Sequence, residues 1–365
     1  MSAAPIPFRV IDTGVRAGRA NVAFDQALIE ARKEGIIPDT IRFLRFRPSA
    51  LIGRHQILSH EVSVDYCRRR GIEIGRRVTG GGGLYLDEGQ LGWELVFDRR
   101  TLGLADLADA TRRICEAAVR GLNALGVAAC YRPRNDLEIG GRKVGGTGGF
   151  FDGDTLFFQG TLLVDFDPQE MIAALRVPAS KLAKRDLASA GQRVITLREV
   201  LGAQLPSLKS IYDGLLAGFA EGLDIAPRWG SITTAEEDLA ERLYREEIGT
   251  EEFVAMLDAP AADGTAVSAS LTTAGGTVRA DIRLEHPAGQ RIREVLITGD
   301  FFVTPPRVVL DLEAALRGIE AAQAGRAVEE FLARTPAQFM SLSRGDFRSV
   351  VETALDSVQP VGAPR

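Results

Sequence analysis

The sequence predicts an α+β protein. Strand-like segments follow one another without a helix between them, as at 41–46 and 49–53 on either side of Pro48. Strands that do not alternate strictly with helices favour an α+β sheet over a doubly wound one. A length of 365 residues is long for one core and indicates a larger and a smaller domain. The 45% of hydrophobic and 25% of charged residues are typical of a globular protein.

The first half of the chain carries alternating apolar patterns and helix signals. Asn21 stands where an N-cap would begin a helix over 21–34. The most regular helix is predicted over 104–125, where leucine, isoleucine and alanine recur at helical spacing before Gly126. Other predicted elements are strands at 91–97 and 155–166, a β-hairpin at 135–147, and helices at 61–70, 167–175, 209–222 and 235–247.

A change of composition divides the chain. The stretch 256–266 is rich in alanine, proline and glycine and is typical of a linker. We therefore expect a catalytic domain at 1–255 and a small accessory domain with a flexible tail at 256–365. The predicted elements of the second domain are strands at 267–273, 277–284 and 292–298 and helices at 307–322 and 325–333.

Charge and cysteine content exclude several functional classes. The formal net charge of −5 argues against nucleic-acid binding, and no apolar run is long enough to cross a bilayer. The N-terminus lacks the pattern of a signal peptide. Three widely spaced cysteines and three histidines without metal-ligand spacing predict neither a disulfide framework nor a zinc site. A cytoplasmic protein is expected.

The most informative segment is a glycine loop. Arg76 and Arg77 precede Val78 and Thr79, four glycines occupy 80–83, and Leu84 and Tyr85 follow. Glycine backbones turn their N–H groups toward one point, and such a concavity binds anions. Neighbouring arginines supply further donors for phosphate or carboxylate. The loop has neither the ending of a P-loop nor the spacing of a dinucleotide fingerprint, so it predicts a different anion site.

Two later segments complete a candidate site. In the first, Asn135 and Asp136 precede a short hairpin, and Lys143 follows beside small residues. A lysine there places one compact cation where a carboxylate and a phosphate meet. The second segment, 158–163, puts Gln159, Gly160 and Thr161 into an apolar strand and is suited to a pocket wall.

In combination these motifs resemble the lipoate–protein ligases of the biotin/lipoate ligase superfamily. The glycine loop is similar to the family pattern Arg-Arg-x-Ser/Thr-Gly-Gly-Gly, and 135–147 resembles its Asn-Asp-Leu hairpin with a following lysine. The strand Gly-Thr-Leu-Leu at 160–163 and the segments 11–14 and 53–56 also match, in order, over about the first 200 residues. The segment 297–302 resembles the accessory domain of such ligases, here fused.

The resemblance implies a fold and a reaction. The fold would be a mixed, largely antiparallel sheet flanked by helices. The enzyme would use ATP and Mg²⁺ to convert lipoate to lipoyl-AMP, and would then transfer the lipoyl group to a lysine of an acceptor protein. Acceptors in the family are lipoyl domains or the glycine-cleavage carrier. The resemblance leaves open whether lipoate or octanoate is the preferred acid.

The resemblance also assigns roles to individual residues. Lys143 is the expected catalytic residue, between the acid carboxylate and the phosphate. The expected ATP or adenylate site consists of Arg77, Gly82, Gly83, Leu84, Tyr85, Asn135, Asp136 and Lys143. The expected lipoate site consists of Lys143, Val144, Gly145, Gly146 and Thr161, and Asp136 is the expected Mg²⁺ ligand. His55 is a weaker candidate.

Two positions depart from the family pattern, and rival functions remain. Leu86 and Gln159 stand where many relatives carry histidines.

The main rival is an octanoyl or lipoyl transferase with Cys130 as the acyl nucleophile, activated by Arg132 and Arg134. The favoured interpretation of Cys130 is a buried apolar residue at a strand start. A biotin ligase and a non-catalytic lipoyl-binding relative are less favoured.

Overall fold

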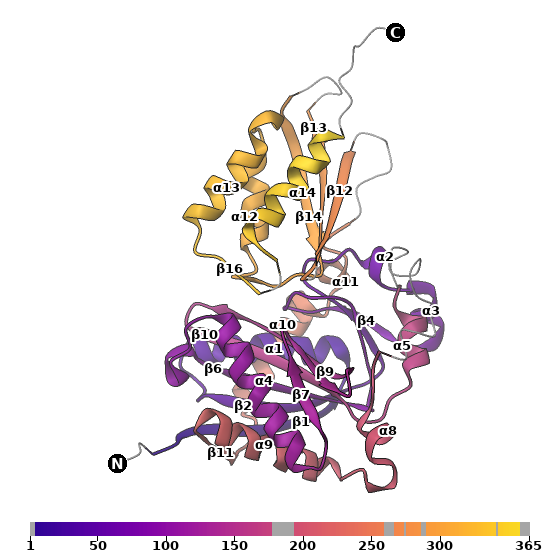
Figure 1. The fold of residues 1–365 in the computed structure, drawn as a ribbon, viewed down its shortest axis with the longest axis vertical. Helices are drawn as coiled ribbons and strands as arrows, with labels where there is room; N and C mark the ends of the chain where they lie inside the picture. Colours follow the sequence, from indigo (N-terminus) through magenta and orange to yellow (C-terminus); the bar gives the residue numbers. More distant parts are fainter. Residues whose placement is uncertain are drawn as a thin grey trace.

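A computed structural model describes residues 4–176, 193–258, 266–273, 275–285, 290–340 and 342–357. Its larger part is built on an eight-stranded sheet, and its smaller part follows in the chain and lies at one end of the molecule (Figure 1). The sheet order is β11 (Ile225–Trp229), β1 (Ile6–Arg16), β2 (Thr40–Phe46), β6 (Gln90–Asp98), β10 (Thr155–Leu163), β9 (Arg142–Asp152), β8 (Asp136–Ile139) and β7 (Ala129–Arg132).

The sheet is mixed, and most of its pairings are antiparallel. Strand β1 pairs in parallel with both β11 and β2, whereas the pairings from β2 to β7 are antiparallel. A small second sheet has the order β4 (Glu73–Arg76), β3 (Ser49–Ile52) and β5 (Leu84–Leu86). The glycine loop therefore connects β4 to β5, which are the two edge strands of this small sheet. The α+β prediction is confirmed.

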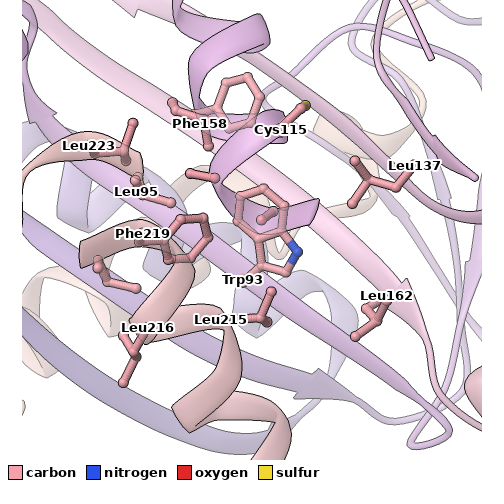
Figure 2. Close-up of a cluster of buried hydrophobic side chains, with 14 of the residues drawn as sticks. Trp93, Leu95, Cys115, Leu137, Phe158, Leu162, Leu215, Leu216, Phe219 and Leu223 are labelled. Carbon is pink, nitrogen blue, oxygen red and sulfur yellow. The ribbon is translucent and has the colours of Figure 1, made fainter. Parts of the chain in front are cut away.

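Helices cover both faces of the large sheet. On one face, α4 (Leu107–Ala124) and α9 (Leu208–Leu223) pack together around Trp93, which is fully buried against Phe219 and Phe158 (Figure 2). The opposite face is covered by α1 (Gly18–Lys33) and α10 (Thr234–Leu243). The alternation of side chains along each strand produces these two cores.

Shorter elements lie around the sheets. The helices are α2 (Leu58–Glu61), α3 (Val64–Arg70), α5 (Pro168–Ala174), α8 (Leu197–Leu201) and α11 (Glu251–Val254). Single turns are η1 (Arg99–Leu102), η2 (Gly202–Gln204), η3 (Tyr244–Ile248) and η4 (Ala321–Gln323). Within the described ranges, no helix combines the length and the apolar character that crossing a membrane requires.

The C-terminal part has a core of its own. Its sheet order is β12 (Ala266–Thr273), β13 (Gly276–Leu284) and β14 (Ile292–Gly299), and its helices are α12 (Val308–Leu316), α13 (Ala324–Arg334) and α14 (Arg344–Asp356). A short ribbon joins β15 (Val303–Thr304) to β16 (Gln338–Phe339). The apolar cluster of this part contains no residue before 267, which supports a division near 256 that stays a prediction.

Several predicted bounds were wrong for identifiable reasons. Helix α1 begins at Gly18, so Asn21 is not its N-cap; the buried Asn21 amide instead donates to the Arg45 carbonyl at 2.9 Å. The helix expected over 61–70 is split into α2 and α3 around Val62. The helix expected over 307–322 ends at Leu316. Strands β1 and β11 and helix α14 were not predicted.

Candidate active site

A cavity of about 770 Å³ lies between the glycine loop, α1 and the face of the large sheet that α1 covers. This volume is ordinary for a small-molecule site. Most residues expected at the site line it together. They are Arg77, Gly82, Gly83, Leu84, Tyr85, Asn135, Asp136, Lys143, Gly145, Gly146 and Thr161.

Val144 is placed differently from the expectation. Its side chain is fully buried in the core on the α4 side of the sheet and does not belong to the cavity wall. Neighbouring residues of a strand point to opposite faces, so Lys143 and Val144 cannot both face one cavity from a regular strand.

The Arg77 guanidinium braces the glycine loop from inside. It donates to the carbonyls of Leu51 at 2.7 Å, Gly80 at 3.0 Å and Gly82 at 2.8 Å, and its Nε reaches the Thr79 hydroxyl. Burial lowers the pKa of Arg77 to about 10, which still leaves it charged at neutral pH. Arg77 therefore fixes the loop directly, with most of its donors already used.

Lys143 presents its ammonium at the cavity wall. Its Nζ lies 2.7 Å from Asp136 Oδ1. The other carboxylate oxygen of Asp136 accepts from Arg132, which also pairs with Glu138. The Lys143 backbone bonds to the segment after 192, donating to the Arg193 carbonyl and accepting from the Ile195 N–H. The backbone is thus fixed, while the carboxylate that pairs with the ammonium among the described residues can also be satisfied by a second cation.

Asn135 ties the start of β8 to strand β9. Its Nδ2 donates to the Thr147 carbonyl at 2.7 Å, and its own carbonyl accepts from the Thr147 N–H and hydroxyl. These bonds hold the side chain at the cavity edge. The carboxamide oxygen is the part of Asn135 that remains suited to contact a ligand.

The C-terminal part closes one side of the cavity. Asp300 and Phe302 belong to the cavity wall. A Cβ added at Gly81 or Gly148 would lie 2.6 or 2.4 Å from the Phe302 ring, so the ring rests directly on two glycine backbones. In addition, the Gly81 N–H donates to the Phe301 carbonyl at 3.1 Å. One N–H of the glycine loop is therefore used by the accessory part.

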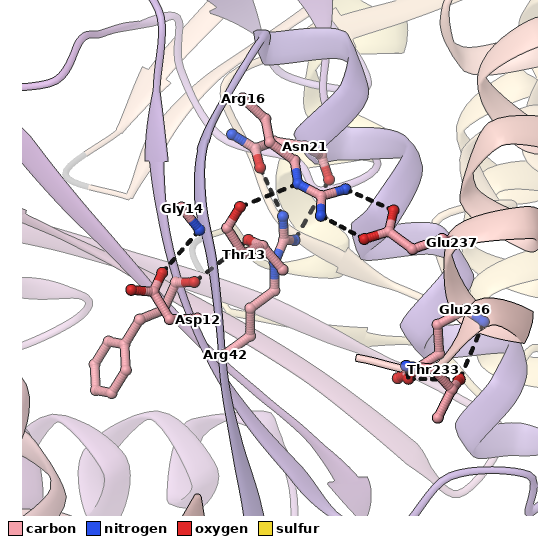
Figure 3. Close-up of polar contacts among 10 residues, drawn as sticks. Asp12, Thr13, Gly14, Arg16, Asn21, Arg42, Thr233, Glu236 and Glu237 are labelled. Carbon is pink, nitrogen blue, oxygen red and sulfur yellow. Dashed lines mark hydrogen bonds and ion pairs between the residues drawn. The ribbon is translucent and has the colours of Figure 1, made fainter. Parts of the chain in front are cut away.

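A buried group of charges lies beneath the cavity, and it was not predicted. Arg42 Nη1 donates to Asp25 Oδ1 at 2.5 Å and to Glu94 Oε2 at 3.0 Å. Both acidic residues belong to the cavity wall, although they are almost fully buried. Arg42 also donates to Thr13 and Asn21, toward which its side chain extends (Figure 3). The sequence feature that could have revealed this group is Glu94, an acidic residue within the largely apolar strand β6.

The two positions that depart from the family pattern both line the cavity. Leu86 is buried in the wall, and Gln159 donates from Nε2 to the Thr79 hydroxyl at 2.9 Å. Gln159 thereby links strand β10 to the glycine loop that Arg77 also braces. Leu86 contributes only apolar surface.

None of the three cysteines belongs to the cavity wall, although Cys115 lies behind it with Sγ 3.4 Å from the hydroxyl of the wall residue Thr147. Cys130 is exposed on the edge strand β7, which corrects the expectation of a buried residue. Cys115 lies in the core among the side chains around Trp93 (Figure 2), and burial raises the pKa of its thiol to about 12. Cys67 is buried near α5. None is among the described residues that form the cavity wall.

His55 also lies outside the cavity wall. It is 5% exposed and stacks on Phe301, with 5.0 Å between ring centres. Burial, together with the charges of Arg54 and Arg76, lowers the pKa of His55 to about 3. A histidine that stays neutral and stacked serves packing between the two parts of the chain.

The residues offer limited ligands for a metal. Across the described ranges, no group of three or more His, Cys, Asp or Glu residues is arranged to hold an ion. Asp136, the expected Mg²⁺ ligand, already faces Lys143 and Arg132. Mg²⁺ commonly keeps one or two carboxylates, waters and substrate phosphates as ligands. Asp136 fits such a site only as a single ligand beside a nucleotide.

Several known proteins are similar to this chain in sequence. The chain is 31% identical over 245 residues to lipoate-protein ligase A subunit 1 of Thermoplasma acidophilum, covering 64% of this chain and 91% of that protein. It is 29% identical over 269 residues to octanoyltransferase LipM of Symbiobacterium thermophilum, covering 67% and 97%. Sequence similarity therefore extends to ligases and transferases alike.

Solved structures with a similar fold are also known. The bi-partite lipoate protein ligase from T. acidophilum, described with its E2 lipoyl domain, has a TM-score of 0.61 at 28% identity and covers 70% of this chain and 99% of its own. P. falciparum LipL1, solved in complex with lipoate, covers 96% of this chain and 100% of its own with a TM-score of 0.70. Its 12% identity shows the fold alone, including the C-terminal part.

The family model described as the lipoyl protein ligase A/B catalytic domain matches residues 17–220, more than half of the chain. This match covers the glycine loop, the Asn135–Asp136 hairpin and Lys143, which the fold brings to one cavity. The chain belongs to the lipoyl protein ligase A/B catalytic domain family.

Proposed function

We propose that this protein is an ATP-dependent lipoate–protein ligase. Family membership makes it an acyl-transferring enzyme, and the single observation that favours a ligase is the composition of the cavity wall. That wall presents Lys143 and the glycine loop, whereas all three cysteines of the chain lie elsewhere. An acyl transferase with a cysteine nucleophile needs a thiol at the reacting carbonyl.

The first step joins lipoate to AMP. A lipoate carboxylate oxygen attacks the α-phosphorus of ATP, and the bond to the leaving pyrophosphate breaks. Lys143 neutralises the carboxylate and the phosphate, once its ammonium exchanges Asp136 for the substrates. Arg132 remains on Asp136, so the carboxylate is not left without a cation when Lys143 moves. Such positioning and charge neutralisation account for catalysis without a covalent enzyme intermediate.

The loop and hairpin residues hold the nucleotide in this proposal. Gly82, Gly83 and Tyr85 line the adenylate, and Arg77 acts by fixing the loop. Asn135 and Asp136 contact the nucleotide from the hairpin. Mg²⁺, with Asp136 as its one protein ligand, would supply further charge neutralisation at the phosphates.

The second step transfers the acyl group. The ε-amine of an acceptor lysine attacks the carbonyl carbon of lipoyl-AMP, and AMP leaves. A lipoyl domain or a glycine-cleavage carrier is the proposed acceptor, since the T. acidophilum relative is described together with an E2 lipoyl domain. Thr161, Gly145 and Gly146 shape the slot for the acyl chain. A cytosolic location stays a prediction.

The transferase alternative rests on the LipM relatives and is tested by cysteine substitution. Cys130→Ser and Cys115→Ser are each incubated with ATP, Mg²⁺, lipoate and a lipoyl domain, and acceptor lipoylation is followed by intact-protein mass spectrometry. Both folded variants should lipoylate the acceptor at rates within about threefold of the parent chain, because a ligase uses neither thiol in the reaction. Acyl transfer from an acyl thioester without ATP, lost in folded Cys130→Ser, would support the transferase instead.

A further inference from the structure

The distance from Lys143 to the buried charges of Asp25, Arg42 and Glu94 follows from the register of the large sheet. The Lys143 ammonium stands over Gly146, where an added Cβ would be 2.7 Å from Nζ. In the sheet register, Gly146 faces Thr161 and Thr161 faces Gly92, so two strand spacings separate Gly146 from β6.

Glu94 lies two residues farther along β6 than Gly92. With strands about 4.8 Å apart and a rise of about 3.3 Å per residue, roughly 12 Å separates the Gly146 and Glu94 backbones. An acid whose carboxylate meets Lys143 therefore has room for an extended chain of about eight carbons before it reaches Glu94. The distal end of the acid would lie against this carboxyl group.

Glu94 makes this end of the slot polar. Its carboxyl shares Arg42 Nη1 with Asp25, so one guanidinium serves two buried carboxyl groups. Arg77 is a second buried cation that acts on Asp25. Around the pair the wall is apolar, with Val22, Leu44 and Leu51. Burial and the neighbouring Asp25 raise the pKa of Glu94 well above its usual range, and a hydrogen bond joins the two carboxyl groups.

We propose that Glu94, together with Asp25, selects lipoate over octanoate by contacting the distal end of the acid. This inference rests on the proposed function. A methyl terminus offers the carboxyl pair no hydrogen-bonding atom, whereas the dithiolane ring brings two polarisable sulfur atoms that accept weakly. A site built around a hydrogen-bonding group rejects an analogue that lacks its partner.

The test is equilibrium binding to the full chain without ATP, measured by titration calorimetry. The parent chain should bind lipoate at least about tenfold more tightly than octanoate. Glu94→Leu should bring the ratio of the two dissociation constants close to one, since Asp25 then pairs with Arg42 alone. Glu94→Gln, which keeps a hydrogen-bonding group of the same size, should retain most of the preference.

Two controls separate this selection from other effects. Lys143→Ala should weaken both acids by the same factor and leave their ratio unchanged, because it acts at the carboxylate end. In the parent chain, 8-hydroxyoctanoate should bind more tightly than octanoate, a comparison that does not depend on the folding of any variant. An unchanged ratio in folded Glu94→Leu, or equal binding of all three acids by the parent chain, would overturn the inference. Binding of neither lipoate nor octanoate would contradict the proposed function itself.

Discussion

At the scale of single residues, Lys143 has the most direct proposed role. Its ammonium faces the cavity, and its partner Asp136 is also served by Arg132. Lys143→Ala should reduce pyrophosphate release from ATP and lipoate by roughly 10²–10³-fold, the usual effect of removing one group that stabilises developing charge. Release is measured with a coupled pyrophosphate assay.

The matched control for this variant is Lys209→Ala. Lys209 lies exposed on α9 and pairs with Asp213 at 2.6 Å, remote from the cavity wall. Its removal should leave the rate unchanged. A Lys143→Ala protein that releases pyrophosphate at the parent rate would remove Lys143 from the mechanism.

Arg77 is expected to act through the loop. Arg77→Lys keeps the charge, but one ammonium cannot reach the carbonyls of Leu51, Gly80 and Gly82 in the geometry of the guanidinium fork. We expect the free energy of unfolding to fall by about 2 kcal/mol, since buried acceptors lose their donors. The KM for ATP should rise at least about tenfold, because a misplaced site costs binding.

Urea denaturation and initial rates measure these two effects. Arg69→Lys, on the exposed end of α3, is the control and should change neither. A rise in KM without any loss of stability would instead favour direct contact between Arg77 and phosphate.

At the scale of elements, strand β9 contacts the segment before β15 where the Phe302 ring packs on the Gly148 backbone. Gly148→Ala would place a Cβ 2.4 Å from the Phe302 ring, so the ring must move. Loss of packing should slow adenylate formation and lower stability by about 1–3 kcal/mol, as overpacking does. Thermal unfolding and pyrophosphate release are the measurements.

The double variant identifies the cause of this effect. In a Phe302→Ala background the clash is absent, and Gly148→Ala should then cost less than about 0.5 kcal/mol. Such non-additivity is expected for residues in contact, whereas distant and independent sites add. Additive effects of the two substitutions would show that Gly148 does not bear on Phe302.

The sequence predicted elements well where a pattern depends on neighbours in the chain. The apolar spacing of 104–125 corresponds to α4, and the glycine loop and hairpin were located from local signals. Strand β1 was missed because its pairing partners, β2 and β11, are brought together only by the fold. Long-range pairing leaves little trace in one strand's own sequence.

The same distinction applies to the candidate site. Lys143, Asp136 and the glycines stand in recognisable motifs, whereas Asp25 belongs to a helix and Glu94 to a separate strand. Their meeting on Arg42 depends on the packing of α1 against β2 and β6. Phe302 belongs to the segment 297–302, which resembles the accessory domain of such ligases. Its position over Gly81, however, depends on how the two parts of the chain dock.

At the scale of the whole molecule, the C-terminal part docks on the glycine loop through a short segment. The Gly299 N–H donates to the His55 carbonyl at 2.9 Å, and Phe301 stacks on the His55 ring. The folded state keeps His55 neutral down to a pH of about 3, whereas an unfolded chain protonates it near 6.5. The unfolded state therefore binds one more proton between these values, and stability falls as pH decreases through this window.

This proton linkage predicts a pH-dependent difference between variants. His55 should contribute a slope approaching about 1.4 kcal/mol per pH unit below 6.5. His55→Phe should remove that contribution, measured by urea unfolding at several pH values from 7.5 to 5. Exposed His60, changed to Gln, serves as the control and should retain most of the slope. Parallel curves for His55→Phe and the parent chain would contradict the buried, neutral state of His55.

The most direct test of the central claim is formation of an acyl-adenylate by the full chain in the absence of any acceptor. The chain is incubated with ATP, Mg²⁺ and lipoate, and lipoyl-AMP and pyrophosphate are quantified by mass spectrometry and a coupled assay. We expect both products in equal amounts, and transfer of the lipoyl group when a lipoyl domain is added. Acylation of the lipoyl domain from an acyl thioester without ATP, with no adenylate formed from lipoate, would contradict the proposed ligase.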